Sequence, residues 1–131
     1  MEKFISPYLI DMIREEIGGN LRMKKDDSVY LRHILDAISR IEEYEGFLDN
    51  HLIQDGVIRQ IEIIGEATKR LSQEIKEKHP EIPWKDMARM RDKLTHGYFG
   101  VDLDAVRDTV ERDIPALKNK LRNLVEKEGK M

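Results

Sequence analysis

The sequence contains no cysteine, few aromatic residues and no long apolar run. Without cysteine among its 131 residues, the chain can form neither a disulfide framework nor a thiolate metal site, and a reducing compartment costs it no stability. No apolar run approaches the roughly 18 residues that a membrane-spanning helix needs, and the N-terminal residues carry several charges that a secretory signal would lack. These absences predict a cytoplasmic protein that is neither secreted nor bound to a membrane.

The sequence also lacks a large excess of charge of either sign. The chain has 23 basic and 26 acidic side chains, so its formal net charge is only −3, and the two signs are interleaved along the sequence. A protein with this small negative net charge has no overall positive potential that would bind nucleic acid non-specifically. Any contact with RNA must therefore be local. The length fits a single domain of ordinary size.

Apolar residues recur at helical spacing throughout the chain, and no segment alternates with the period of a strand. The expected helices run from Ile5 to Ile17, from Asp26 to about Gly46–Asn50, from Val57 to His79–Pro80, from Trp84 to Gly97, and from Asp102 to about Glu128. Asp26 and Asp27 are expected to cap the second helix and Asp102 the last one. Pro115 lies inside the last stripe without breaking its phase, so it should bend that helix rather than end it.

This pattern predicts an all-α fold, an antiparallel four-helix-type bundle with an additional N-terminal helix. The bundle would occupy residues 23–131. Residues 1–22 would form an accessory amphipathic helix, whose apolar stripe is expected to pack on its own bundle or on a second copy of the chain.

The densest group of reactive side chains is Arg91-Asp-Lys-Leu-Thr-His96-Gly-Tyr98, at the end of the fourth expected helix. Arginine binds phosphate oxygens through paired, charge-assisted hydrogen bonds, and histidine transfers protons near neutral pH. On a regular helix Arg91 and His96 would point about 140° apart. The helix is therefore expected to end at or just before His96, with Gly97 turning His96 and Tyr98 toward Arg91.

Cleavage of RNA without a metal ion needs a base for the 2′-hydroxyl, a cation for the phosphorane oxygens and an acid for the leaving 5′-oxygen. One Arg91 and one His96 supply only two of these three groups. A two-fold dimer with the motif at its seam would supply two of each, so the chemistry favours a homodimer with a composite cleft. A monomer that binds RNA without cutting it would also satisfy the sequence.

The same residue types suit an ordinary helix terminus, in which Arg91 pairs with a carboxylate and His96 caps carbonyl groups. A carboxylate-bridged metal site in a bundle needs Glu-x-x-His pairs, and none of the four histidines has an acidic residue three positions before it. No metal and no other cofactor is therefore expected. Glu66, on the third expected helix, is predicted to orient Arg91 across the bundle.

Several stretches taken together are similar to a known family. They are Ile64-Gly65-Glu66-Ala67, Ile82-Pro83-Trp84 and the run from Gly97 to Asp102. Arg91, Asp92, His96 and Tyr98 also match a signature of Arg, four to six residues, His, any residue, Tyr. With these features, residues from about 23 to 125 resemble the HepT-like branch of the HEPN superfamily, the ribonuclease toxins of bacterial and archaeal toxin–antitoxin pairs.

The resemblance implies a helical homodimer that cleaves RNA without a metal ion, with Arg91 and His96 as its catalytic pair and Asp92 and Gly97 in support. It also implies a partner, a minimal nucleotidyltransferase antitoxin that transfers AMP to Tyr98. A nucleotide on Tyr98 would place an anion and a purine where the RNA phosphate must lie. A non-catalytic helical module that binds a nucleotide or a partner is the alternative.

Overall fold

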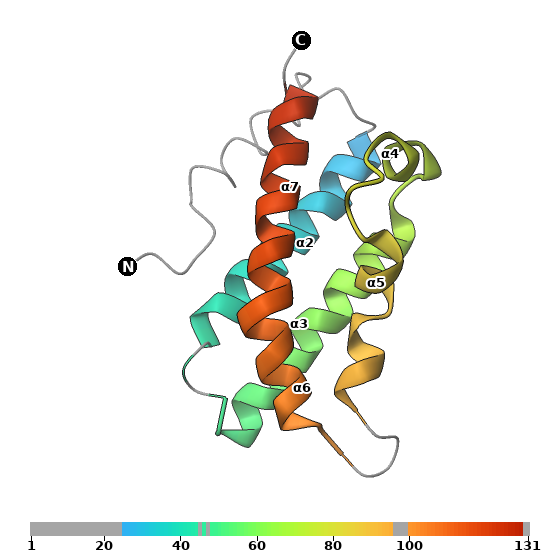
Figure 1. The fold of residues 1–131 in the computed structure, drawn as a ribbon. Coiled ribbons are helices and arrows are strands. Elements are labelled where there is room, and N and C mark those ends of the chain that lie inside the picture. The colour runs from blue at the N-terminus through green and yellow to red at the C-terminus, as the bar shows by residue number, and fades with distance from the viewer. Residues whose placement is uncertain (1–24, 45, 47, 96–99, 130–131) are drawn as a thin grey trace.

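The computed structural model describes residues 25–44, 46, 48–95 and 100–129, and it is helical over most of them (Figure 1). The elements are α2 (Lys25–Tyr44), α3 (His51–Arg70), α4 (Gln73–Lys78), α5 (Trp84–Ala88), the 3₁₀ helix η1 (Met90–Leu94), α6 (Leu103–Asp108), the π-helical turn η3 (Thr109–Asp113) and α7 (Ile114–Gly129). Within these described ranges there is no strand, and the predicted all-α fold is confirmed. The accessory helix expected at residues 1–22 lies outside them.

The core lies where α2, α3 and α7 pack together (Figure 1). Each helix buries one apolar stripe, and the members that solvent reaches least include Ile34, Leu35, Ile38 and Ile41 from α2, Val57, Ile61 and Ile64 from α3, and Leu121 and Leu124 from α7. Full burial of each such side chain contributes about 1.5–3 kcal/mol. None of the helices in the described part of the chain is both long enough and apolar enough to span a bilayer.

The third expected helix is two helices, so the prediction of one continuous helix from Val57 to His79 is wrong. α3 ends at Arg70, Leu71 is extended, and Ser72 starts α4 by accepting a hydrogen bond from the Ile75 N–H. Leu71 and Ile75 are both buried on either side of the break. Because the apolar spacing continues through the corner, periodicity alone could not reveal it.

Asp26 and Asp27 lie in the first turn of α2, where the sequence placed them, and Asp27 fixes the corner between α3 and α4. Its carboxylate is almost completely buried, and it accepts hydrogen bonds from the Ser72 backbone N–H at 2.8 Å and from the Ser72 hydroxyl at 2.6 Å. A carboxylate buried with two donors is satisfied, and losing either partner would be costly. Asp27 thus ties the start of α2 to the junction between α3 and α4.

The last helical segment, α6 followed by η3 and α7, begins as predicted. The Asp102 side chain accepts a hydrogen bond from the Ala105 N–H at 3.0 Å, which confirms it as the N-cap. The disturbance expected from Pro115 takes the form of a π-helical turn immediately before it, in which the Ile114 N–H donates to the Thr109 carbonyl five residues back. Val110 and Ile114 stay buried, so the stripe keeps its phase.

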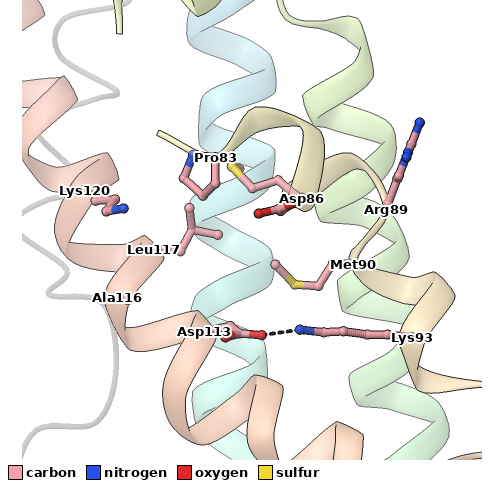
Figure 2. A pocket seen from close by; sticks show the side chains of 10 residues that line it. Pro83, Asp86, Arg89, Met90, Lys93, Asp113, Ala116, Leu117 and Lys120 are labelled. Carbon is pink, nitrogen blue, oxygen red and sulfur yellow. Dashed lines mark hydrogen bonds and ion pairs between the residues drawn. The ribbon is translucent and has the colours of Figure 1, made fainter. Parts of the chain in front are cut away.

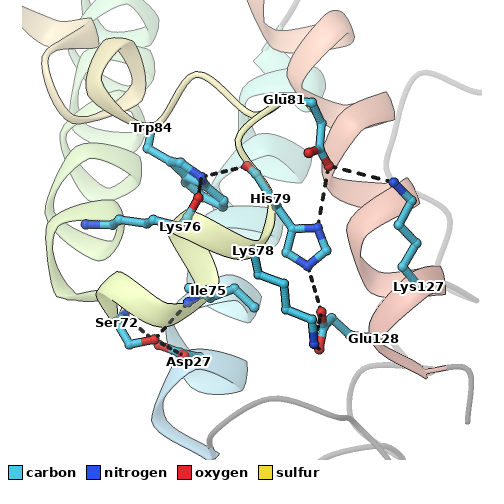
Figure 3. Close-up of polar contacts among 10 residues, drawn as sticks. All are labelled: Asp27, Ser72, Ile75, Lys76, Lys78, His79, Glu81, Trp84, Lys127 and Glu128. Atoms are coloured by element: carbon cyan, nitrogen blue, oxygen red, sulfur yellow. Dashed lines mark hydrogen bonds and ion pairs between the residues drawn. The ribbon is translucent and has the colours of Figure 1, made fainter.

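The C-terminal end of α7 is fastened to the turn after α4 by buried polar contacts (Figure 3). His79 Nε2 lies 2.6 Å from Glu128 Oε2, and Lys78 Nζ lies 3.0 Å from the same oxygen. On the other side of the ring, Glu81 lies 3.5 Å from His79 Nδ1. A hydrogen bond from its own backbone N–H, helped by the charges of Lys127 and His79, holds the pKa of the Glu81 carboxyl below its usual value.

A glycine sets how closely α3 approaches α5. Gly65 is buried, and a Cβ atom placed on it would lie 3.1 Å from the carbonyl oxygen of Ala88, the last residue of α5. That distance is tighter than ordinary van der Waals contact, and the neighbour is backbone rather than a flexible side chain. A side chain at this position would therefore push α3 and α5 apart, and Arg91 follows the end of α5 by three residues.

We expect Gly65→Ala to lower the free energy of unfolding by about 1–3 kcal/mol, because the added methyl group overpacks this contact. The matched control is Gly56→Ala on the same helix, where a Cβ atom would meet only the ring edge of Tyr44 at 3.4 Å. The helix propensity of alanine should make the control neutral or stabilising by up to about 1 kcal/mol. Urea denaturation of both variants measures the difference, and equal stabilities would contradict the role given to Gly65.

Candidate functional site

The segment that carries the motif is not one regular helix. α5 ends at Ala88, Arg89 leaves the helical conformation with φ −112° and ψ 9°, and η1 follows as a 3₁₀ helix. Trp84 anchors the start of α5, since its indole N–H donates to the carbonyl oxygens of Lys76 at 3.2 Å and His79 at 3.0 Å (Figure 3). The single helix predicted from Trp84 to Gly97 is therefore wrong.

The apolar side chains of this segment lie where the sequence placed them. Met87, Met90 and Leu94 are all buried on the inner side. They hold α5 and η1 against the bundle, although the backbone changes its helical form between Met87 and Met90. The motif is consequently presented from a packed support.

The helical segment ends before His96, as predicted. Thr95 is extended and forms an isolated antiparallel bridge with Val101, and the Asp102 N–H donates to the Leu94 carbonyl at 2.8 Å. His96, Gly97 and Tyr98 lie outside the described residues. Their expected approach to Arg91 stays a prediction.

Arg91 contacts a carboxylate from the neighbouring helix α3. Its Nε atom lies 2.9 Å from Glu62 Oε2, with 47% of the Arg91 side chain and 34% of the Glu62 side chain exposed. Among the residues that the structure describes, none forms a hydrogen bond with the two terminal nitrogens of the Arg91 guanidinium. An arginine held through Nε can still present both terminal nitrogens to an anion.

Arg91 and Glu62 line a polar hollow of about 370 Å³ between α3 and the α5–η1 segment. The other side chains around it include Arg59, Glu66, Lys69 and Asp92. Three cations and three carboxylates thus surround the hollow, so its formal charges balance. Arg91 has both positive and negative side chains around it. The sequence brings Arg91 and Asp92 to the hollow from η1, and α3 supplies the rest of the charged side chains.

Glu66 does not make the contact that was predicted for it. Glu66 lines the same hollow, but its carboxylate pairs with Lys69 Nζ at 3.2 Å, and the carboxylate on Arg91 belongs to Glu62. The two glutamates are four residues apart and so share one face of α3. That spacing could have suggested either one, and sequence reasoning chose the wrong glutamate.

A second hollow lies on the opposite side of η1, toward α7 (Figure 2). Its volume is about 290 Å³ and its floor is apolar, with Met90 and Leu117 among the lining residues. Two cations lie two residues from Arg91 in the sequence. Lys93 is held in this hollow by Asp113 at 2.5 Å, and the Arg89 side chain points away (Figure 2). Lys120 of α7 and the carboxylates of Asp86 and Asp113 also line this hollow.

No group of three or more histidine and acidic side chains in the described part of the chain is arranged to hold a metal ion. The polar hollow at Arg91 contains three carboxylates, but two of them are engaged by cations, Glu62 by Arg91 and Glu66 by Lys69. The arrangement suits an anionic ligand that approaches Arg91.

Comparison with known proteins identifies relatives along most of the chain. The profile of the family described as ribonuclease HepT-like matches residues 30–124. A probable ribonuclease HepT of Thermococcus cleftensis is 50% identical over 108 residues, which cover 78% of this chain and 98% of that protein. A putative RNase of Caldanaerobacter subterraneus is 40% identical over 105 residues, covering 76% of this chain and 94% of that protein.

A longer relative from Methanocaldococcus jannaschii, named as a gamma-glutamylcyclotransferase and putative RNase, is 48% identical over 110 residues, covering 79% of this chain. The matched region spans 50% of that relative, about half of its length. No solved structure matches the chain. The family match runs from α2 through the Arg91 hollow and the motif to α7, and the chain therefore belongs to the HepT-like ribonuclease family.

Proposed function

We propose that the protein is a metal-independent endoribonuclease and that Arg91 and His96 are its catalytic residues. The observation that carries this proposal is the placement of Arg91 at a polar hollow, held through Nε by Glu62 with its terminal nitrogens bonded to no residue that the structure describes, in a chain of the HepT-like ribonuclease family. An arginine presented in this way suits the phosphate of an RNA chain.

The proposed reaction is an internal transfer followed by departure of the 5′-oxygen. A base takes the proton of the 2′-hydroxyl, the 2′-oxygen bonds to phosphorus, and the bond from phosphorus to the 5′-oxygen breaks as an acid protonates that oxygen. The products are a 2′,3′-cyclic phosphate and a 5′-hydroxyl. Arg91 would stabilise the charge that builds on the phosphorane oxygens, and the imidazole of His96 would transfer a proton.

The motif of one chain supplies one imidazole, that of His96, whereas the reaction needs both a base and an acid. We therefore propose a homodimer whose composite cleft contains Arg91 and His96 from both copies. In this arrangement one His96 acts as the base and its counterpart as the acid. The hollow at Arg91 would then open onto the cleft.

The proposed biological role is that of a toxin whose partner is a minimal nucleotidyltransferase. The partner would neutralise the ribonuclease by transferring AMP to the hydroxyl of Tyr98, with loss of pyrophosphate from ATP. The added phosphate is an anion placed two residues from His96, and Arg91 would bind it in place of the RNA phosphate.

Cleavage of a labelled RNA by the purified protein should proceed in excess EDTA and should leave 2′,3′-cyclic phosphate ends that mass spectrometry identifies. His96→Ala should slow the reaction by about 10²–10⁴-fold, because it removes proton transfer in the transition state. His51→Ala is the matched control, since His51 is exposed at the start of α3 and lines none of these hollows.

A dependence on divalent metal, or cleavage that survives His96→Ala, would contradict the assignment. RNA that is bound but left intact would instead favour the alternative, a non-catalytic module that binds a nucleotide or a partner.

Glu62→Gln should lower the rate of cleavage at saturating RNA by about 10–100-fold, because loss of the ion pair lets the Arg91 guanidinium leave its position. The melting temperature should change little, since a half-exposed ion pair contributes at most about 1 kcal/mol. Glu66→Gln removes the same charge from the same hollow without touching Arg91, and it should retain most of the activity. Equal losses in the two variants would show that Glu62 has no special role.

Co-expression with a nucleotidyltransferase encoded next to this protein should add the mass of one or more AMP groups, and peptide mapping should place the first of them on Tyr98. The Tyr98→Phe variant should stay unmodified at that position and keep cleaving RNA in the presence of the partner. Inhibition without any added mass would mean that the partner only covers the site.

A further inference from the structure

A groove on the outer side of the α2–α3 pair lies next to the Arg91 hollow. Its volume is about 280 Å³, and its lining includes Tyr30 and His33 from α2 and Arg59 and Arg70 from α3. Arg59 and Glu66 line both the groove and the hollow, so these two side chains form the boundary between them. An extended ligand that occupies the Arg91 hollow would have to cross this boundary to reach the groove.

The α2 side of the groove presents an aromatic pair. The rings of Tyr30 and His33 meet edge to face, with centroids 6.2 Å apart and an interplanar angle of 78°. Tyr30 is partly buried against the hydrophobic core, whereas His33 is exposed. One ring is thus anchored and the other is accessible, an arrangement that suits stacking of a planar base.

The α3 side of the groove carries positive charge. Arg59 and Arg70 are exposed, and neither forms an ion pair with any residue that the structure describes. Among the described residues of the lining, the only carboxylate belongs to Glu66, which Lys69 engages at 3.2 Å. The two arginines are eleven residues apart, so their backbones are separated by about 16 Å along the helix axis. The groove is locally basic although the whole chain has a net charge of −3.

We propose that this groove is a binding subsite for single-stranded RNA beside the scissile phosphate. A base of a flanking nucleotide stacks on the Tyr30–His33 pair, and the RNA backbone crosses Arg59 and reaches Arg70. Aromatic rings next to exposed arginines are the combination that binds unstacked bases and their phosphates. The inference rests on the proposed ribonuclease function and adds the path that its substrate takes across α3.

Binding of a 2′-O-methyl oligonucleotide, which lacks the attacking hydroxyl, tests the groove separately from cleavage. In fluorescence anisotropy, His33→Ala and Tyr30→Leu should each weaken binding by roughly 5–100-fold. Arg70→Gln should reduce the slope of log K against log salt by about 0.7. Arg122→Gln is the matched control, since Arg122 lies on α7 and lines none of the three hollows. Because Tyr30 is partly buried, its replacement could also affect folding. His33 is exposed, so His33→Ala tests the groove without disturbing the core.

Cleavage assays separate the groove from the catalytic groups. The variants at His33 and Arg70 should raise KM for a long RNA at unchanged kcat, and they should cleave a dinucleotide, which is too short to reach the groove, as fast as the wild type does. If these variants bind and cleave long RNA like the wild type, the groove inference is wrong and the ribonuclease function stands.

If the wild-type protein neither binds nor cuts RNA, both proposals fall. The inference would also be overturned if His33→Ala or Arg70→Gln dissociated the proposed dimer in sedimentation while the resulting monomer still bound RNA normally. That result would assign the groove to contact with a second copy of the chain.

Discussion

The close packing of α3 against the end of α5 determines where the candidate site lies. Gly65 lets α3 approach the Ala88 carbonyl. Three residues after Ala88, η1 presents Arg91 to the same face of α3. A glycine at this point gives up helix propensity to gain proximity. Everything proposed for Arg91 depends on that contact, since the hollow is formed by the two elements that meet there.

The ion pair between Arg91 and Glu62 is more informative about position than about stability. Both side chains are substantially exposed, and such pairs contribute little to the free energy of folding. The pair nevertheless restricts a long and flexible arginine side chain to one region of the hollow. A charged group held in place before the substrate arrives loses less entropy on binding it. By contrast, the buried contacts of Glu128 with His79 and Lys78 hold the far end of α7 and lie away from the hollow.

The sequence specifies the helices more clearly than it specifies their interruptions. Apolar stripes predicted the three long helices, and the conflict between Arg91 and His96 on one helix correctly predicted that helical structure ends before His96. The corner at Leu71 was missed, because buried residues continue at helical spacing on both sides of it. The choice between Glu62 and Glu66 was also missed, since it depends on the relative rotation of two packed helices, which spacing along one helix does not contain.

The proposed ribonuclease function requires that the hollow between α3 and η1 receives an RNA phosphate. A crystal structure of the protein with a 2′-O-methyl RNA tests it most directly. We expect a non-bridging phosphate oxygen about 2.9 Å from a terminal nitrogen of Arg91, with Glu62 still on the Nε side. RNA bound elsewhere on the molecule, with the Arg91 guanidinium fully engaged by protein carboxylates, would contradict it.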